Sequence, residues 1–412
     1  MRPESVMAAP WPAPRRPRPR RALGLLGLLM GMPALAAADQ PPQLTDLGLR
    51  PYVGVAFAHD DNVLGLADGS AAAANSRHLD GGLLYDRQLS QQVFSAALQA
   101  SRISYDQLPQ LDNTAKDLRA NWNWHIGNRF DGNLGAFYVQ GLAPFVNFHS
   151  LARNLRSERR EVADGGWLLH PRWRLRAGLA RDTLYYALPS EQPGNRDEKT
   201  VELGADYLAP SGSTIGTQLR HTRGNYPHPQ PIANLLVDNS YRQDELKAKV
   251  NWLFSAKTQL LFLGGLVERH HDQFTMRDYR GFNARLNANW QTTAKLGFSL
   301  ATWREIGALD DVTAAYTLNQ GHAVYANWDA TAKVRVEAGL RRESSDYSGS
   351  AAIASILPAR KDTVRSASLK LVYQATPRLR VTAQAYRNER QSNVAGNSYP
   401  ASGIIVGTRY EF

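Results

Sequence analysis

Apolar and polar side chains alternate with a period of two along most of this chain, from Tyr52 to Phe412. Because successive side chains of a β-strand point to opposite faces, this period predicts strands with one apolar and one polar face. In segment 117–125, for example, Leu118 and Trp122 lie on one face and Arg119 lies on the other. The clearest segments are 117–125, 200–207, 245–252, 282–290 and 334–340.

The alternating segments are long and several end in Trp or Tyr, as at Trp124, Trp252 and Trp290. Strands of soluble sandwiches usually have about 5 to 6 residues, whereas a tilted strand needs about 9 to 11 residues to cross a bilayer. Aromatic residues gather where such strands meet the membrane interfaces. The lengths therefore favour a membrane-spanning β-barrel.

Short polar connections and longer loops alternate between the expected strands. The short connections are 89–92, 127–129, 170–172, 209–212, 255–257, 291–294, 329–331 and 375–377, and the long ones are 60–75, 106–113, 143–156, 188–197, 225–240, 271–278, 307–315, 344–361 and 391–398. This arrangement predicts an all-β fold: a transmembrane antiparallel up-and-down β-barrel of about 18 strands, with both chain ends on the periplasmic, short-turn side. A propeller would also repeat regularly, but each four-stranded blade needs several short turns and each repeat here offers one.

The first residues resemble a secretory signal peptide. Five arginines, Arg15, Arg16, Arg18, Arg20 and Arg21, precede the apolar run 22–35, and small residues at 34–38 offer cleavage sites. The run is shorter than the roughly 20 residues of a spanning helix, which disfavours the alternative of a membrane anchor. We expect a signal peptide at 1–38, a short periplasmic segment at 39–49 and the barrel at 50–412.

Composition supports export and a barrel. Hydrophobic residues make up 43% of the 412 residues, yet mean hydropathy is -0.42, as alternation would produce. Beyond the leader no apolar stretch reaches helical spanning length, so any later membrane crossing must use strands. The chain has no Cys, which excludes disulfides, thiolate metal ligands and Cys nucleophiles. Residues 1–38 carry six Arg and one Glu, so the net charge falls from +11 to +6 without them.

No motif for catalysis, phosphate binding or zinc binding is present, so we expect no enzyme activity, no cofactor and no nucleic-acid partner. His270 and His271 are adjacent on a strand and should face opposite sides, which argues against a shared metal. The acidic segments 60–62 and 310–311 leave calcium binding open, although loops are commonly acidic.

The polar face of the strands carries many basic residues that we expect to line the lumen. They are Arg119, Arg174, Arg176, Arg220, Lys247, Lys249, Arg285, Arg335, Lys370 and Arg380. Asp117, Glu202, Asp206, Glu245 and Glu337 share this face, so we expect a mixed lining with a basic excess. Such a wall would concentrate anions, but the same charges could also brace the barrel as ion pairs.

The last strand places Ile404, Val406, Thr408, Tyr410 and Phe412 on one face. This ending, with Tyr410 and the terminal Phe412, resembles the C-terminal assembly signal of outer-membrane barrels, and it implies recognition by the barrel-assembly machinery. It also implies a location in the bacterial outer membrane, in contact with its lipid.

Segments 52–63, 241–245 and 252–281 together resemble the EpsL family, outer-membrane barrels encoded in exopolysaccharide biosynthesis operons, within a broader group of β-barrel porins. The resemblance covers nearly the whole chain after the leader and supplies no catalytic residues. It implies a conduit that exports a polysaccharide polymer together with periplasmic export proteins. Two alternatives are a docking scaffold with a plugged lumen and a general anion-preferring porin.

Overall fold

The computed structural model describes residues 48–67, 69–145, 151–232, 234–307, 314–348 and 359–412. Within these ranges the chain forms one large antiparallel sheet and a separate small hairpin. The strands of the large sheet are β1 (Gly48–Asp60), β2 (Ala74–Leu89), β3 (Gln92–Tyr105), β4 (Asn113–Ile126), β5 (Phe130–Leu142), β6 (Leu155–His170), β7 (Trp173–Tyr186), β8 (Arg196–Leu208), β9 (Thr214–Asn225), β12 (Tyr241–Ser255), β13 (Thr258–His271), β14 (Tyr279–Gln291), β15 (Leu296–Gly307), β16 (Tyr316–Asp329), β17 (Val334–Ser348), β18 (Lys361–Gln374), β19 (Leu379–Ser392) and β20 (Tyr399–Glu411).

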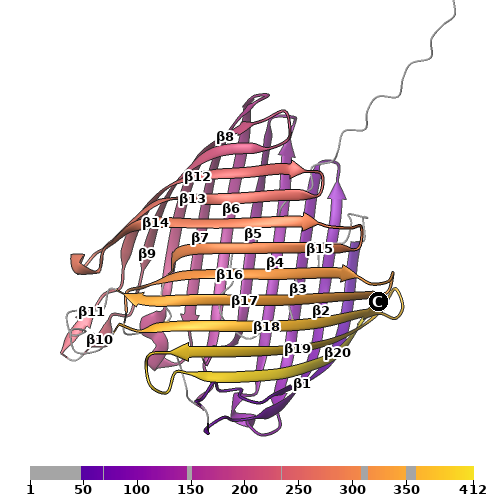
Figure 1. Cartoon of the computed structure of the whole chain (residues 1–412), viewed down its shortest axis with the longest axis vertical. Helices are drawn as coiled ribbons and strands as arrows, with labels where there is room; N and C mark the ends of the chain where they lie inside the picture. The colour runs from indigo at the N-terminus through magenta and orange to yellow at the C-terminus, as the bar shows by residue number, and fades with distance from the viewer. Residues whose placement is uncertain (1–47, 68, 146–150, 233, 308–313, 349–358) are drawn as a thin grey trace, which may run out of the picture.

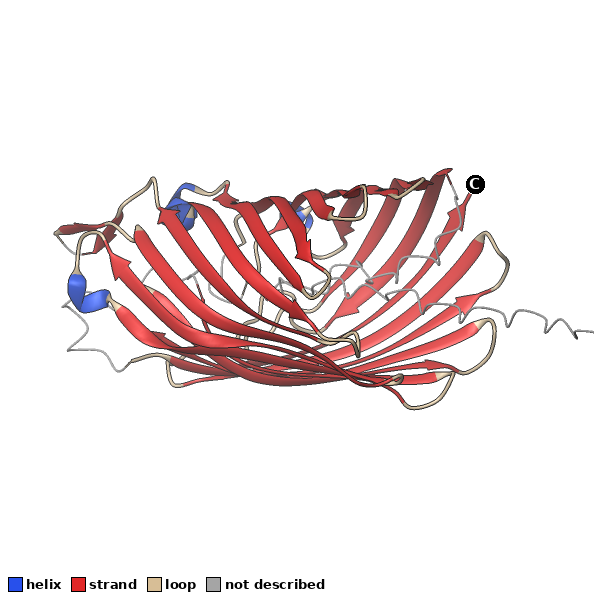
Figure 2. Ribbon diagram, turned by 90° about the horizontal axis from the view of Figure 1, so that it is seen from above, coloured by secondary structure: helices blue, strands red, loops and turns tan. Residues whose placement is uncertain are grey.

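The sheet is a closed barrel of 18 strands, as the sequence predicts. Each strand pairs with its neighbours along the chain, and β9 pairs directly with β12. The first and last strands close the wall, with Tyr52 opposite Glu411, and the amide of Phe412 donates a hydrogen bond to the carbonyl of Pro51 at 3.0 Å. Figure 1 shows β12 to β20 crossing in front of the steeply inclined β2 to β8, and Figure 2 shows the curved wall from above.

The structure has turns at the positions where the sequence predicts short connections. All eight short connections join the expected strand pairs, and the strand ends that flank the longer connections lie at the opposite end of the barrel. At the β4–β5 turn Gly127 has a φ of 57°, a left-handed conformation that glycine adopts without strain. The sequence did not predict the hairpin of β10 (Gln230–Ile232) and β11 (Leu235–Val237), nor the short 3₁₀ helices η1 (Pro109–Leu111), η2 (Pro189–Gly194) and η3 (Thr275–Arg277).

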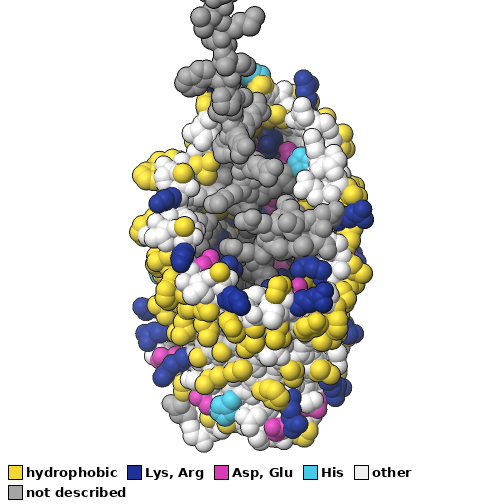
Figure 3. Space-filling model, turned by 90° about the vertical axis from the view of Figure 1, so that its right-hand side faces the viewer, with side chains coloured by type: hydrophobic (Ala, Val, Ile, Leu, Met, Phe, Trp, Pro, Cys, Tyr) yellow, Lys and Arg dark blue, Asp and Glu magenta, His cyan; other side chains and the backbone are white. Residues whose placement is uncertain are grey.

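The outer face of the wall carries exposed apolar side chains, as lipid requires. On β8 and β9 these include Val201, Leu203, Ile215 and Leu219, all of which share the outward face through the strand register. A girdle of exposed aromatic residues lies near the short-turn ends, formed by Trp122, Trp167, Trp173, Trp252, Trp290, Trp328, Tyr373 and Tyr410. In the space-filling view, hydrophobic side chains gather in a broad band over the outer wall (Figure 3).

Among the described residues, no helix is both long and apolar enough to span a membrane. The expected signal peptide at 1–38 lies outside the described residues, and so does the periplasmic segment 39–49 except for Gly48 and Leu49, which begin β1.

Candidate functional site: the inner face of the barrel

The structure places all ten basic residues singled out from the sequence on the inner face of the wall. The strand register fixes this face: Leu118 lies opposite Leu98 in the outward row, so the neighbouring Arg119 points inward. The same alternation turns Arg174, Arg176, Arg220, Lys247, Lys249, Arg285, Arg335, Lys370 and Arg380 inward.

The inner face of β5 to β8 holds a small ionic network. Asp131 on β5 lies 3.8 Å from both Arg174 and Arg176 on β7. Arg176 also approaches Asp206 on β8, at 3.3 Å. Because each guanidinium faces a carboxylate across the wall, these charges connect three strands by ion pairs instead of standing free in the lumen.

A second network continues around the wall from β8 to β12. Arg220 on β9 contacts Glu202 on β8 and lies 4.0 Å from Glu245 on β12. Glu245 in turn contacts Lys247, and both of these side chains are almost completely buried. Lys249 lies on the same strand and face, two residues further toward the short-turn end.

The other five of the ten basic residues have polar partners. Arg285 contacts Glu305 at 2.6 Å, Arg335 contacts Asp329 at 2.7 Å, and Arg119 contacts Asp117 at 2.7 Å. Lys370 lies 3.5 Å from Glu337, and Arg380 donates a hydrogen bond to Gln374. The sequence analysis missed the partners Asp131, Glu305 and Asp329, as well as Asp164 beside them, because their strands alternate less clearly.

Charge is distributed differently on the two faces. On the described strands, the register gives the inner face equal numbers of basic and acidic side chains, so the expected basic excess of the lining is absent there. On the outer face, basic residues outnumber acidic ones by more than two to one, and almost all of them lie near the extracellular strand ends. These outward basic residues are Arg77, Arg87, Arg102, Lys116, Arg159, Arg181, Lys199, Arg223, Arg242, Arg280, Arg304, Arg342, Lys361, Arg365 and Arg387, and the outward acidic residues are Glu161, Asp197, Asp244, Glu268, Asp346 and Glu389.

Neutral amides share the inner face with the ion pairs. They form rows along β4 and β14, where they alternate with the outward Trp122, Leu286 and Trp290. Carboxamides and hydroxyls both donate and accept hydrogen bonds, and Asn289 and Ser299 already pair at 2.9 Å. The inward amides of these two strands are Asn113, Asn121, Asn123, Asn283, Asn287, Asn289 and Gln291.

At the extracellular end, the loop between β1 and β2 packs against inward side chains. Val63 and Leu64 join Tyr105, Leu111 and Phe145 in a small buried cluster. The Tyr386 hydroxyl donates a hydrogen bond to Asp60 at the end of β1. This loop is therefore held against inward side chains at the extracellular end of the barrel.

On the opposite side of the mouth, His271 is buried at the extracellular end of β13, beyond the apolar belt. Burial of the imidazole, together with the nearby Arg269 and Arg277, lowers the pKa of His271 to about 4. Its backbone amide donates a hydrogen bond to Asp278 at 2.8 Å. The neighbouring His270 faces outward and contacts Asp278 with its Nδ1 atom, so the two histidines do lie on opposite faces.

The described residues contain no group of three or more His, Asp or Glu side chains that could hold a metal ion. In segment 60–62, considered for calcium, the carboxylates accept protein hydrogen bonds: Asp60 from the Asn62 amide and Asp61 from the Ser402 amide. Segment 310–311 lies outside the described residues. Tyr410 and Phe412 point outward in edge-to-face contact, with ring centroids 5.2 Å apart, and their role as an assembly signal stays a prediction.

Comparison with known proteins agrees with this geometry. Residues 242–412, which span nearly all of β12 and the strands that follow it, match the family model described as "Putative beta-barrel porin 2". The chain is an outer-membrane β-barrel, and its C-terminal part is similar to this porin family. No curated protein matches it.

Among solved structures, similar folds include OpdK from Pseudomonas aeruginosa (9% identity, TM-score 0.45) and OccAB3 from Acinetobacter baumannii (9%, 0.45), and each match covers 88% of this chain and 99% of the other chain. The siderophore receptor PirA from Pseudomonas aeruginosa is 12% identical, with a TM-score of 0.42. The match covers 89% of this chain and 80% of the PirA chain. At these scores the likenesses carry no argument about what passes through the barrel.

Proposed function

We propose that the barrel is a passive conduit through which a hydrated extracellular polysaccharide leaves the cell. The observation that carries this proposal is the chemistry of the inner face, where paired charges and rows of amides provide many hydrogen-bonding groups without a net charge on the strands. The resemblance to the EpsL family supports the same assignment.

A polysaccharide presents many hydroxyl groups and little apolar surface, so it must exchange hydrogen bonds with water for hydrogen bonds with the wall as it moves. Amides such as Asn121 and Asn287 can donate and accept in turn, and ion pairs such as Arg285–Glu305 offer both polarities side by side. Transport requires contacts that are favourable enough to admit the polymer and weak enough to release it. A repeating, charge-balanced surface meets both conditions.

A deletion strain tests this proposal, with polymer measured at the cell surface and in the periplasm. We expect surface polymer to fall and polymer to accumulate in the periplasm, with recovery when the wild-type gene is restored. Normal secretion without periplasmic retention would contradict the proposal.

Site-directed variants connect the phenotype to the lumen. Asn287→Trp should narrow the passage and lower polymer export, whereas Leu286→Trp adds the same side chain to the lipid face of the same strand and should leave export unchanged. Both variants should keep heat-modifiable mobility on gels, which reports a folded barrel. Equal export by the two variants would mean that the polymer does not pass along this wall.

A general diffusion porin is the second candidate, and the porin family match over residues 242–412 favours it. Conductance of the purified barrel in planar bilayers separates the possibilities. A conduit or porin gives discrete channels, and only a polysaccharide conduit should be blocked by micromolar polymer. A scaffold with a plugged lumen should give no channels and would contradict both proposals.

A further inference from the structure

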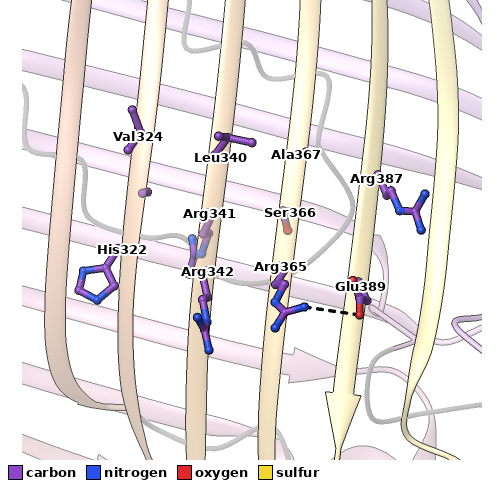
Figure 4. Close-up of a pocket in the computed structure, with 11 residues that line it drawn as sticks. His322, Val324, Leu340, Arg341, Arg342, Arg365, Ser366, Ala367, Arg387 and Glu389 are labelled. Carbon is purple, nitrogen blue, oxygen red and sulfur yellow. Dashed lines mark ion pairs between the residues drawn. The ribbon is translucent and has the colours of Figure 1, made fainter.

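An open groove of about 340 Å³ lies on the outer surface of the barrel, across strands β16 to β19. Its row on the extracellular side consists of residues that are direct partners across neighbouring strands: His322 faces Arg342, Arg342 faces Arg365, and Arg365 faces Glu389. Arg387 lies on the same face of β19, one outward position closer to the membrane centre. The close-up in Figure 4 shows these side chains along adjacent strands.

The groove carries a local excess of positive charge. Its single carboxylate, Glu389, lies 3.8 Å from Arg365. Within the described residues, Arg342 and Arg387 have no ion-pair partner. At two other positions on the outer rim, by contrast, Arg181 contacts Asp197 at 2.8 Å and Arg223 contacts Asp272 at 2.6 Å. We therefore expect an anionic ligand to bind in this groove and not where the arginines of the rim are paired with carboxylates.

The floor of the groove is apolar. Val324, Leu340 and Ala367 are partners in the next outward row toward the periplasm, and Leu340 is 63% exposed. On β17 the outward positions from Val334 to Leu340 are all apolar, and Arg342 is the first charged residue beyond them. The opposite edge of this belt is marked by Trp328 and Tyr373 near the short turns. The arginines thus lie where the belt ends on the extracellular side, at the headgroup level of the outer leaflet.

From this arrangement we infer that the groove binds a phosphorylated glycolipid of the outer leaflet, with its phosphate between Arg342, Arg365 and Arg387 and an acyl chain over Val324, Leu340 and Ala367. The planar guanidinium group binds phosphate oxygens through two parallel hydrogen bonds, which suits arginine to this role better than lysine. The apolar floor adds contact with a hydrocarbon chain, which free phosphate would not use. The inference rests on the position of the barrel in the outer membrane and is independent of what passes through the lumen.

Native mass spectrometry of the detergent-solubilised full-length barrel with bisphosphorylated lipid A tests the inference. We expect one tightly bound lipid in the wild-type protein and binding weaker by about tenfold or more in the triple variant R342Q/R365Q/R387Q, which loses the charge-assisted hydrogen bonds. The matched control R159Q/R181Q/R223Q removes the same charge from ion-paired positions of the same rim and should bind as the wild type does. Equal binding by all three proteins would overturn the inference.

Competition experiments test whether the ligand is a glycolipid, and a second variant covers the case in which the triple variant does not fold. Phosphatidylglycerol or inorganic phosphate that competes with lipid A at equal concentration would contradict a glycolipid site. If the triple variant does not fold, Ala367→Trp fills the floor while retaining the arginines, and it should also weaken lipid A binding. Unchanged binding by A367W would show that the groove is not where the lipid lies.

Discussion

Arg390 on β19 donates a hydrogen bond to Asp362 on β18 at 2.6 Å, and their side chains are only 1% and 3% exposed. Asp362 also contacts Arg360 at 2.9 Å, so two cations surround one buried carboxylate at the inner side of the mouth. Removal of one partner of a buried pair costs about 3 to 5 kcal/mol, because the other charge remains desolvated.

We therefore expect Arg390→Met to lower the free energy of unfolding by about 3 kcal/mol, near the lower end of that range because Arg360 remains. Urea unfolding of the detergent-refolded barrel, followed by tryptophan fluorescence, measures the change. The double variant R390M/D362N should recover part of the loss. Arg181→Met, which breaks an exposed pair, should cost about 0 to 1 kcal/mol, and an equal cost at both sites would contradict the argument.

The charge balance of the inner face predicts weak ion selectivity for the wild-type barrel. Replacement of Arg119, Lys247, Lys249, Arg285 and Arg335 by Gln would leave acidic residues in excess on the wall, so the reversal potential in a salt gradient should shift toward cation preference. Replacement of Asp131 and Asp329 by Asn, and of Glu202 and Glu305 by Gln, should shift the reversal potential toward anion preference. If folded variants of both kinds keep the wild-type potential, these ion pairs act only as braces.

Substitution of one arginine on either face of β14 tests which face contacts lipid. Ala284 points outward into the apolar belt, so Ala284→Arg should destabilise the barrel by about 2 to 4 kcal/mol if it lies near the bilayer midplane. Asn287→Arg places the same charge on the inner face of the same strand and should be tolerated. Folding efficiency in lipid vesicles and heat-modifiable mobility report both effects, and the reverse order would mean that the two faces are exchanged.

His271 predicts a pH dependence of stability. Its pKa of about 4 in the folded barrel lies below the value of about 6.5 for an unfolded histidine, so the unfolded chain binds a proton first as the pH falls. Stability should therefore decrease between about pH 6.5 and pH 4, by about 3 kcal/mol in all, and be unaffected above this window. Unfolding of wild type and His271→Gln at pH 7.5 and pH 4.5 measures the difference, and an identical pH response would exclude His271 as its source.

The architecture could be predicted because each strand of a barrel meets two different solvents. Lipid selects Leu118 and Trp122 and the lumen selects Asn121, so the period, the strand lengths and the turns are all visible in the sequence. The ionic partners could not be predicted in the same way. Asp131 meets Arg174 and Arg176 only through the register of three strands, and on β15 the outward Thr302 and Arg304 obscure the alternation that would have identified Glu305.

The hydrogen-bonded seam between β1 and β20 also constrains the order of assembly. Its partners, such as Tyr52 and Glu411, come from opposite ends of the chain, and contacts of such high sequence separation form slowly because a long loop must first be closed. Until β20 arrives, β1 presents an open edge that could pair with another chain. The protein therefore depends on being kept apart from other copies between its synthesis and the closure of the seam.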